Sequence, residues 1–263
     1  MLNLPDVTLV MLETRQHELA DLAVQDCLRQ VNFGDVLVFT DRASMFRSVG
    51  RDVVIVKDWD DKLGWCRFMW DGVPPYLRTS HALCIQWDSW VFDPAMWRPE
   101  YMNYSYIGSP WWYRDGKNVG NSGFSLKSTT LMRYLRKHAD RYPCTSTLED
   151  DLLCRGYRCK LEQEGFVWAP EAVATDFAFE VKRPAPDSRH FGFHAMHNWG
   201  YVLDNDRLLE RARIAARSPY ITHNSWMWER LLERNPQIVE DMLPEFGERG
   251  NTGNTCDPGA TAS

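Results

Sequence analysis

The sequence predicts an α/β fold built on a mostly parallel sheet. Three observations support this prediction: continuous apolar runs at 7–12 and 35–40, an amphipathic helical pattern between them, and a further apolar run at 81–86. A strand, a helix and a second strand within about forty residues form a right-handed βαβ unit. Strands that are apolar on both faces are typical of parallel sheets, so we expect helices to cover this one.

The remaining elements follow from spacing and from capping residues. Thr14 is expected to cap the first helix, whose apolar residues recur at helical spacing, and Phe33-Gly34 is expected to end it. Further strands are expected at 52–56, in 118–126 after a glycine-containing turn, at 166–168 and at 177–179. Further helices are expected from the Ser128 cap to 138 and from 149 to 163.

The C-terminal part has a different composition. It is charged and helical in pattern, with helices expected at 208–216, 225–233 and 237–242, and it becomes rich in Gly, Thr, Asn and Pro from Gly247 onward. We therefore expect an α/β domain over 1–203, a helical extension over 204–246 packed on it, and a disordered tail over 247–263.

Composition restricts the possible functions. The chain has 263 residues, a net charge of −6 and a pI of about 5.7, which argues against nonspecific coating of nucleic acid. Its 12 Trp, 10 Tyr and 12 Phe exceed the needs of a core of this size and can serve as platforms for sugar rings and nucleobases. Seven irregularly spaced cysteines, with no leader pattern and no apolar run of membrane-spanning length, lead us to expect a cytoplasmic protein without a membrane span.

The strand expected at 81–86 ends in a polar pair. Gln86 and Asp88 are two residues apart, so on an extended chain they point to the same side. A carboxylate and a carboxamide at the end of a buried strand suit a divalent cation such as Mn²⁺ or Mg²⁺, which prefers oxygen ligands and keeps positions open for diphosphate. One carboxylate holds such a cation more weakly than two, so the pair needs a further ligand from elsewhere.

Three histidines lie close together at 190, 194 and 197. His194 is bracketed by aromatic residues on a short turn, where metal-binding imidazoles are often found. A zinc site made of His190, His194 and His197 would instead indicate a metal-dependent hydrolase. No glutamate accompanies them in a His-Glu-x-x-His arrangement, which argues against that alternative.

Two further sets could take part in chemistry. Glu149, Asp150 and Asp151 open a helix, and partial burial of one of them would raise its proton affinity towards that of a general base. Trp111 and Trp112 precede a glycine-containing segment at 120–125 and offer apolar faces to a sugar, with loop packing as the alternative. If the aromatic residues act alone, the chain is a non-catalytic carbohydrate-binding module.

Taken in order, these segments resemble the family catalogued as domain of unknown function 5672, which is regarded as glycosyltransferase-like. The matching stretches are 4–15, 35–41, 79–88, 104–110, 119–128, 149–150, 169–180 and 191–194. They span about residues 4–200 and leave out the helical segment after Asp204. Each stretch is short, and the specificity lies in their order.

The resemblance implies a GT-A-type, Rossmann-like fold that binds a nucleotide sugar at the carboxyl ends of its first strands. It implies Asp150 as the base, with Glu149 beside it, and Asp88 and His194 as metal ligands. The residues expected to bind the nucleotide sugar are Thr14, Arg15, Asp41, Arg42, Arg78, Gln86, Trp111, Gly123, Phe124 and Ser125. Gln86 stands where the wider class prefers Asp, which weakens the case for strict metal dependence.

The expected function is transfer of a sugar from a nucleotide diphosphate sugar, with a UDP-sugar as the expected donor, to an acceptor hydroxyl. Asp150 would act as base in an inverting reaction assisted by Mn²⁺ or Mg²⁺. The acceptor could be a glycan, a small molecule, a protein or a hydroxylated base in DNA, the last disfavoured by the acidic charge balance.

Overall fold

The computed structural model describes residues 1–47, 53–55, 62–145, 148–181, 185–223, 225–238 and 241. The chain divides into two compact units, Met1–Asn198 and Trp199–Ser263. The predicted division at residue 203, with a helical extension beyond it, stays a prediction. The predicted tail, 247–263, lies outside the described residues.

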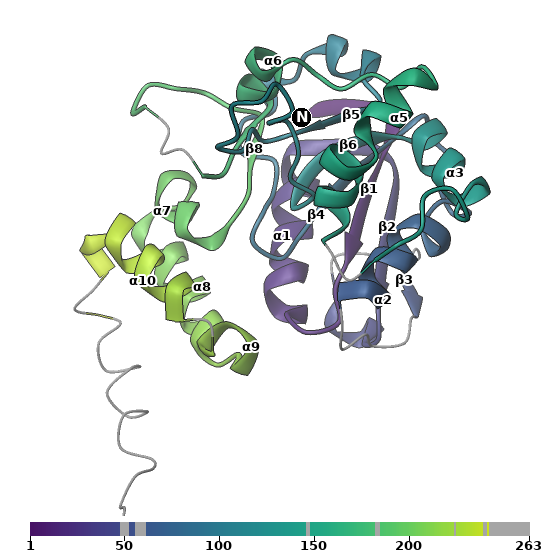
Figure 1. Ribbon diagram of the computed structural model, residues 1–263. Coiled ribbons are helices and arrows are strands. Elements are labelled where there is room, and N and C mark those ends of the chain that lie inside the picture. The colour runs from purple at the N-terminus through teal and green to yellow at the C-terminus, as the bar shows by residue number, and fades with distance from the viewer. Residues whose placement is uncertain are drawn as a thin grey trace, which may run out of the picture. The chain divides into compact units, whose positions relative to one another are not determined.

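A six-stranded sheet in the order β3-β2-β1-β4-β6-β5 forms the centre of the first unit (Figure 1). Its strands are β1 (Leu2–Leu12), β2 (Val31–Thr40), β3 (Val53–Ile55), β4 (His81–Ile85), β5 (Tyr106–Gly108) and β6 (Phe124–Ser128). Strands β1 to β4 pair in parallel, whereas β6 runs antiparallel to both β4 and β5. A smaller sheet pairs β7 (Ala178–Phe179) with β8 (Gly192–Phe193). The predicted α/β class with a mixed, mostly parallel sheet is confirmed.

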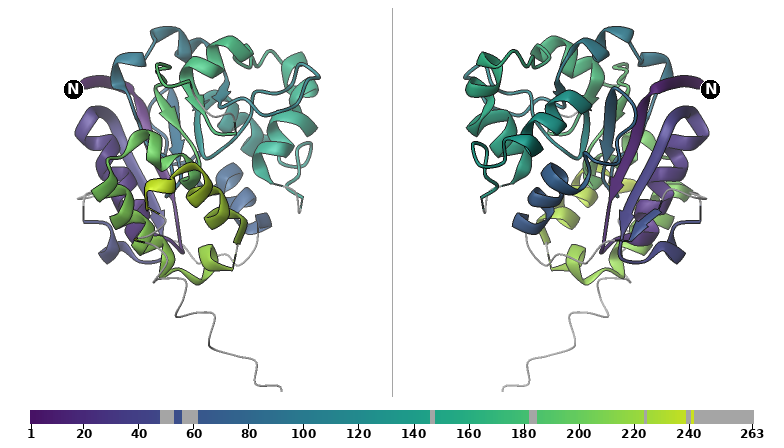
Figure 2. Two further views of the ribbon diagram at one scale, coloured as in Figure 1. Left: turned by 90° about the vertical axis from the view of Figure 1, so that its left-hand side faces the viewer. Right: turned by 90° about the vertical axis from the view of Figure 1, so that its right-hand side faces the viewer.

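Helices cover both faces of the large sheet, as Figures 1 and 2 show. Helix α1 (His17–Gln30) lies on one face, while α2 (Lys62–Arg67), the π-helical turn Phe68–Gly72 and α3 (Thr129–Lys137) lie on the other. The other helices of this unit are α4 (Glu149–Asp151), α5 (Arg158–Gln163) and α6 (Glu171–Phe177). Since side chains alternate along a strand, a central strand such as β1 needs apolar residues at nearly every position.

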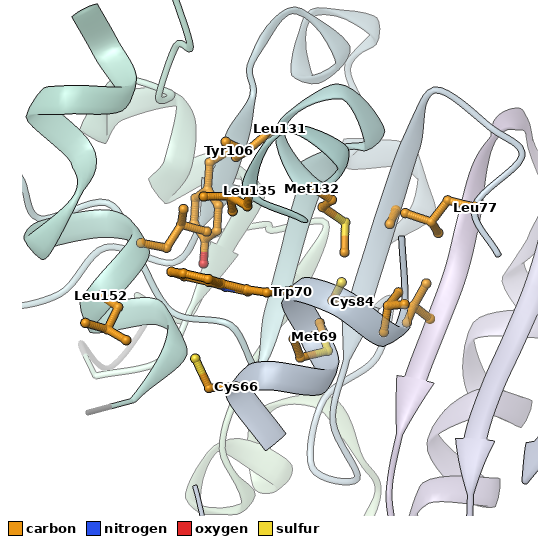
Figure 3. Close-up of a cluster of buried hydrophobic side chains, with 14 of the residues drawn as sticks. Cys66, Met69, Trp70, Leu77, Cys84, Tyr106, Leu131, Met132, Leu135 and Leu152 are labelled. Atoms are coloured by element: carbon orange, nitrogen blue, oxygen red, sulfur yellow. The ribbon is translucent and has the colours of Figure 1, made fainter. Parts of the chain in front are cut away.

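A buried cluster fills the space between the sheet and the α2–α3 side (Figure 3). Trp70 of the π-helical turn lies among Cys84 of β4, Tyr106 of β5 and Leu135 of α3. Full burial of an apolar side chain of this size contributes about 1.5–3 kcal/mol. The cluster also receives Leu152, so it anchors the helical segment that begins at Glu149 to the sheet.

The start of α1 differs from the prediction. Its N-cap is Gln16, and no side chain caps it, so the expected Thr14 cap is wrong. The carboxylate of Glu13 accepts hydrogen bonds from the backbone amides of Arg15 and Gln16, at 2.6 and 3.0 Å. This carboxylate holds the chain in a turn that delays the first helical residue to His17.

The end of α1 also differs, because Phe33-Gly34 does not terminate it. The helix ends at Gln30, and Gly34 lies inside β2, beside the register shift between Leu4 and Thr8 of β1. A Cβ on Gly34 would lie 1.9 Å from the carbonyl oxygen of Pro5. Glycine is therefore required here for a close approach of two strands.

Several later elements are shorter or of another type than expected. Ser128 caps α3 as predicted, accepting from the amide of Leu131. The helix from Glu149 passes into a π-helical turn, Leu152–Gly156, and is interrupted at Tyr157 before α5. Residues 166–168 contribute only an isolated bridge between Trp168 and Tyr106, and Phe177 ends helix α6, which the sequence patterns missed.

The second unit is helical. It contains α7 (Trp199–Val202), α8 (Asn205–Ala216), α9 (Pro219–Thr222), α10 (Ser225–Arg234) and the short 3₁₀ turn Pro236–Ile238. The predicted helices at 208–216 and 225–233 correspond to α8 and α10, whereas most of that at 237–242 falls outside the described residues. In the described part of the chain, no helix combines the length and apolar character that a membrane crossing requires.

Candidate functional site

The carboxyl ends of three parallel strands meet at one edge of the large sheet. Thr14 follows β1, Asp41 follows β2 and Gln86 follows β4. The register confirms their common level, because Leu12 pairs with Phe39 and Met11 with Ile85. Open α/β sheets bind ligands at this edge.

The antiparallel strand β6 begins at the same edge. Phe124 pairs with Ile85, and the backbone amide of Gln86 donates to the carbonyl of Gly123 at 3.0 Å. The three residues before β6, Asn121, Ser122 and Gly123, therefore lie against the end of β4. They are called the 121–123 turn below.

One side of this turn carries three converging polar groups. His194 Nε2 lies 3.2 Å from the Gln86 carboxamide oxygen and 3.4 Å from Asp88 Oδ1. Asp88 is 4% exposed; its Oδ2 accepts from the amide of Met196, and among the described residues nothing donates a hydrogen bond to its Oδ1. The structure thus brings His194 to Gln86 and Asp88, which lie more than a hundred positions earlier in the chain.

Two more groups contact the other ring nitrogen of His194. Nδ1 lies 3.0 Å from the Glu180 carboxylate and 3.0 Å from Nδ2 of Asn121. Burial alone lowers the pKa of His194, but the carboxylates of Asp88 and Glu180 outweigh it and raise the pKa well above its usual value. The two carboxylates therefore favour a positive charge at this position, either on the imidazole itself or on a bound cation.

Gly123 makes room for the imidazole. A Cβ at this position would lie 2.1 Å from both Cδ2 and Nε2 of His194. Asn121 adopts φ 66°, and its side-chain oxygen accepts from the amide of Gly123 at 3.0 Å. The turn is thereby held in a shape against which the ring lies flat.

The other side of the turn carries Asp150. Its Oδ2 accepts from the backbone amide of Ser122 at 3.1 Å, and the residue as a whole is half-buried. Burial, with the nearby negative charge of Glu149 as the second cause, raises the pKa of Asp150 to about 6. A carboxylate with this pKa can accept a proton near neutral pH.

Glu149 has a different environment. It is 3% exposed, its Oε1 lies 2.8 Å from the ammonium group of Lys127, and its Oε2 accepts from the hydroxyl of Ser122. Lys127 is itself 1% exposed. Glu149 thus supports the site from behind, and Asp150 is the member of the pair that a substrate could reach.

A comparison with known protein families finds a match to the middle of the chain. Residues 67–194 match the family model described as "Protein of unknown function (DUF5672)". The family resemblance found in the sequence is thereby confirmed. Gln86, Asp88, the 121–123 turn, Asp150 and His194 all lie within the DUF5672 match, whereas Thr14 and Asp41 precede it.

Two solved structures are similar to the chain. An active-site mutant of LgtC is 12% identical, covers 78% of this chain and 95% of its own, and has a TM-score of 0.45. A glycosyltransferase involved in the glycosylation of the major capsid of PBCV-1 is 10% identical, covers 72% and 91%, and has a TM-score of 0.44. No curated protein matches the sequence. The GT-A type of the predicted fold stays a prediction beyond the mixed, mostly parallel sheet.

Several residues expected to bind the nucleotide, among them Arg15, Asp41 and Arg42, lie before the matched segment 67–194. Asp41 Oδ1 lies 2.6 Å from His17 Nε2, and Arg42 Nε lies 3.7 Å from Asp41 Oδ2. Arg15 and Arg42 are exposed at the sheet edge described above. Arg78 precedes β4, whereas Gln86 follows it, so the strand separates the two and Arg78 does not join the group.

The residues expected to line the sugar pocket differ in their burial and in their distance from the polar group around His194. Phe124 and Ser125 are 0% exposed within β6, so their side chains belong to the interior. Trp111 packs its ring against Gly120 and the buried cluster, and Trp112 is 65% exposed. Gly123, by contrast, lies directly against the His194 ring.

The three-histidine site does not form. The ring nitrogens of His190 form hydrogen bonds with the carbonyl oxygen of Thr175 and the hydroxyl of Ser188. His197 Nε2 lies 3.3 Å from the carbonyl oxygen of Glu180. Within the part of the chain that the structure describes, no group of three or more His, Cys, Asp or Glu side chains is arranged to hold a metal ion.

Proposed function

We propose that this protein transfers a sugar from a nucleotide diphosphate sugar, with a UDP-sugar as the expected donor, to the hydroxyl of an acceptor. The observation that carries the proposal is that one turn supports two different chemical groups. Residues 121–123 contact Asp150, a carboxyl group with a pKa of about 6, and also His194, which lies beside Asp88 and Gln86. The pairing of a base with a diphosphate-binding group is what glycosyl transfer requires.

The residues present fit a divalent cation. His194 Nε2 lies 3.2 Å from the Gln86 carboxamide oxygen and 3.4 Å from Asp88 Oδ1, so the three candidate ligand atoms face one another. The buried Asp88 Oδ1 has the His194 imidazole 3.4 Å away and no closer hydrogen-bond donor among the described residues, so it can accept a further partner. Asp88, His194 and Gln86 would hold the ion, which would neutralise charge on the donor diphosphate.

Asp150 would perform the proton transfer. Its carboxylate accepts the proton of the acceptor hydroxyl as that oxygen attacks the anomeric carbon. The new carbon–oxygen bond forms while the bond to the diphosphate breaks, and the diphosphate leaves with the bonding electron pair. Attack opposite the leaving group inverts the configuration at the anomeric carbon. General-base assistance of this kind contributes about 10²–10⁴-fold to rate.

The amide of Ser122 helps to aim the base. The amide of Ser122 donates to Oδ2 of Asp150, and the amide of Asp151 donates to Oδ1 at 3.0 Å. Each carboxylate oxygen keeps a further lone pair, which can accept the proton of the sugar-acceptor hydroxyl. Any hydroxyl that enters beside the turn can then serve as acceptor; a glycan, a small molecule, a protein and a hydroxylated base in DNA all satisfy the chemistry.

The proposal is tested by donor screening followed by two substitutions. Thermal stabilisation is measured against a panel of nucleotide sugars with Mn²⁺ or Mg²⁺, and transfer or donor hydrolysis is then followed with the stabilising donor. Asp150→Asn should abolish transfer while donor binding persists, whereas Asp88→Ala should weaken both. Asp140→Asn, at an exposed position, is the matched control and should behave as wild type. Near-normal turnover by Asp150→Asn would refute the assignment of the base, and failure of every nucleotide sugar to bind would refute the function.

A further inference from the structure

A buried lysine lies directly behind the proposed base. Lys127 belongs to β6, where its backbone pairs with Ala82 of β4 on one side and Tyr106 of β5 on the other. Its position in the sheet is therefore fixed from both sides. The side chain is 1% exposed and extends into the buried cluster, with its ammonium group 5.6 Å from the centre of the Tyr106 ring.

The ammonium group has two hydrogen-bond acceptors. Lys127 Nζ lies 2.8 Å from Glu149 Oε1 and 3.1 Å from the hydroxyl oxygen of Ser122. The same Ser122 hydroxyl donates to Glu149 Oε2, which closes a three-membered network inside the protein. A buried lysine charge is costly unless it is paired and hydrogen-bonded, so Lys127 depends on Glu149 and Ser122 to remain charged inside the protein.

Both partners of the lysine lead to Asp150. Glu149 is its neighbour in the chain, and the amide of Ser122 donates to Asp150 Oδ2 at 3.1 Å. Asp150 is thus attached on two sides to residues that Lys127 holds. We infer that Lys127 is a positioning residue: by binding Glu149 and Ser122, it fixes the carboxylate of Asp150 relative to the 121–123 turn.

The catalytic part of this inference rests on the proposed function, but the geometric part does not. Asp150 is faced by the negative charges of Glu149 and Asp151 and the positive charge of Lys127, and Glu149 raises its pKa more than Lys127 lowers it. Neutralising the Lys127–Glu149 pair should therefore lower the pKa of Asp150. It should also free the carboxylate to adopt other orientations, and small misplacements of a reacting group can cost about 10²-fold in rate.

The first measurement needs no substrate. Carboxyl groups of aspartate are labelled with ¹³C, and the Asp150 signal is identified by its absence in Asp150→Asn. In the double variant Lys127→Met/Glu149→Gln, which leaves no unpaired buried charge, this signal should titrate at lower pH than in wild type. In Lys160→Met, a matched loss of an exposed lysine, the titration should be unchanged. An unchanged Asp150 titration in the double variant would overturn the inference.

The second measurement uses the donor found by screening. The double variant should lose about 10²-fold in kcat while its KM for the donor changes little, because the groups around His194 are left in place. Glu149→Gln keeps an acceptor for Lys127 and should lose less than the double variant. If kcat stays within twofold of wild type in the double variant, Lys127 does not position the base. If neither the wild type nor any variant transfers sugar, but the Asp150 signal still titrates at lower pH in the double variant, the proposed function fails and the positioning role stands.

Discussion

The backbone amide of Ser122 donates to the carboxylate of Asp150 over 3.1 Å, although the two residues are 28 positions apart in the chain. This contact joins the start of β6 to the start of the helical segment at 149. On the far side of the same turn, Asn121 contacts the ring of His194 at 3.0 Å. The structure thus connects Asp150, the proposed base, and the polar group around His194 through three consecutive residues.

Activity should depend on pH through Asp150. Its pKa is raised to about 6, and only the ionised form can accept a proton. We expect kcat to fall about tenfold for each pH unit below 6 and to level off above it. The profile is measured from pH 4.5 to 8.5 with saturating donor. An acid limb near pH 4, where an ordinary aspartate titrates, would contradict this assignment.

Asp150→Asn should make the protein more stable at neutral pH. A folded-state pKa of about 6 against an unfolded value of 3.8 means that ionisation is less favourable in the folded protein. This cost is absent below about pH 4, grows as pH rises to about 6 and is constant above, with an upper limit of about 3 kcal/mol. Urea denaturation at pH 7.5 and pH 4 should therefore show a stabilisation of the variant that disappears at the lower pH. Equal gains at both pH values would exclude this origin.

Gly123→Ala should impair the site and leave the fold intact. The added Cβ would lie 2.1 Å from the His194 ring, which must then leave Asp88 and Gln86. A loss of at least about 10²-fold in kcat/KM is expected, because displacement of a ligand-binding group by about 1 Å has effects of this size. Gly156→Ala is the control, since its Cβ would meet no atom closer than 3.8 Å. Equal activity of the two variants would show that the ring position is unimportant.

Gly34→Ala should destabilise the first unit without touching the site. A Cβ 1.9 Å from the Pro5 carbonyl oxygen would force β1 and β2 apart at their register shift. Overpacking of this kind costs about 1–3 kcal/mol. The expected result is a lower melting temperature with donor affinity retained at a temperature where the variant is folded. An unchanged melting temperature would contradict the close approach.

Mild oxidation should join Cys66 and Cys144. Their sulfurs lie 2.8 Å apart although 78 positions separate them. The hydrogen bond to Cys144, together with burial, raises the pKa of Cys66, so reaction should begin at the partly exposed Cys144. Diamide would accept two electrons and two protons as the sulfur–sulfur bond forms. Thiol titration should then show two fewer thiols in wild type than before treatment, and no such pairwise loss in Cys144→Ser.

The sequence was sufficient for the large features of the fold. Apolar runs identified β1, β2 and β4, because parallel strands covered on both faces leave a continuous signal. It was insufficient where a distant contact decides the local structure. Gly34 resembles a helix end in the sequence, and its actual role depends on Pro5, which reaches it only across the sheet.

Part of the candidate site could be predicted from the sequence for a related reason. Gln86 ends a strand and Glu149-Asp150 begins a helix, and both positions can be recognised from neighbouring residues. Lys127 gave no such signal, because a lysine within a short strand normally indicates an exposed face, and its partner Glu149 lies 22 positions further along the chain. The different burial of Glu149 and Asp150 could not be read from two adjacent acids either.

The shared use of the 121–123 turn limits how the protein can diversify. A backbone change at Asn121, Ser122 or Gly123 would disturb the contacts to His194 and to Asp150 in one step, so the two proposed halves of the site cannot be altered there separately. New acceptor preferences would have to arise from side chains outside the turn, such as the solvent-facing Trp112, whose replacement leaves the shared support untouched.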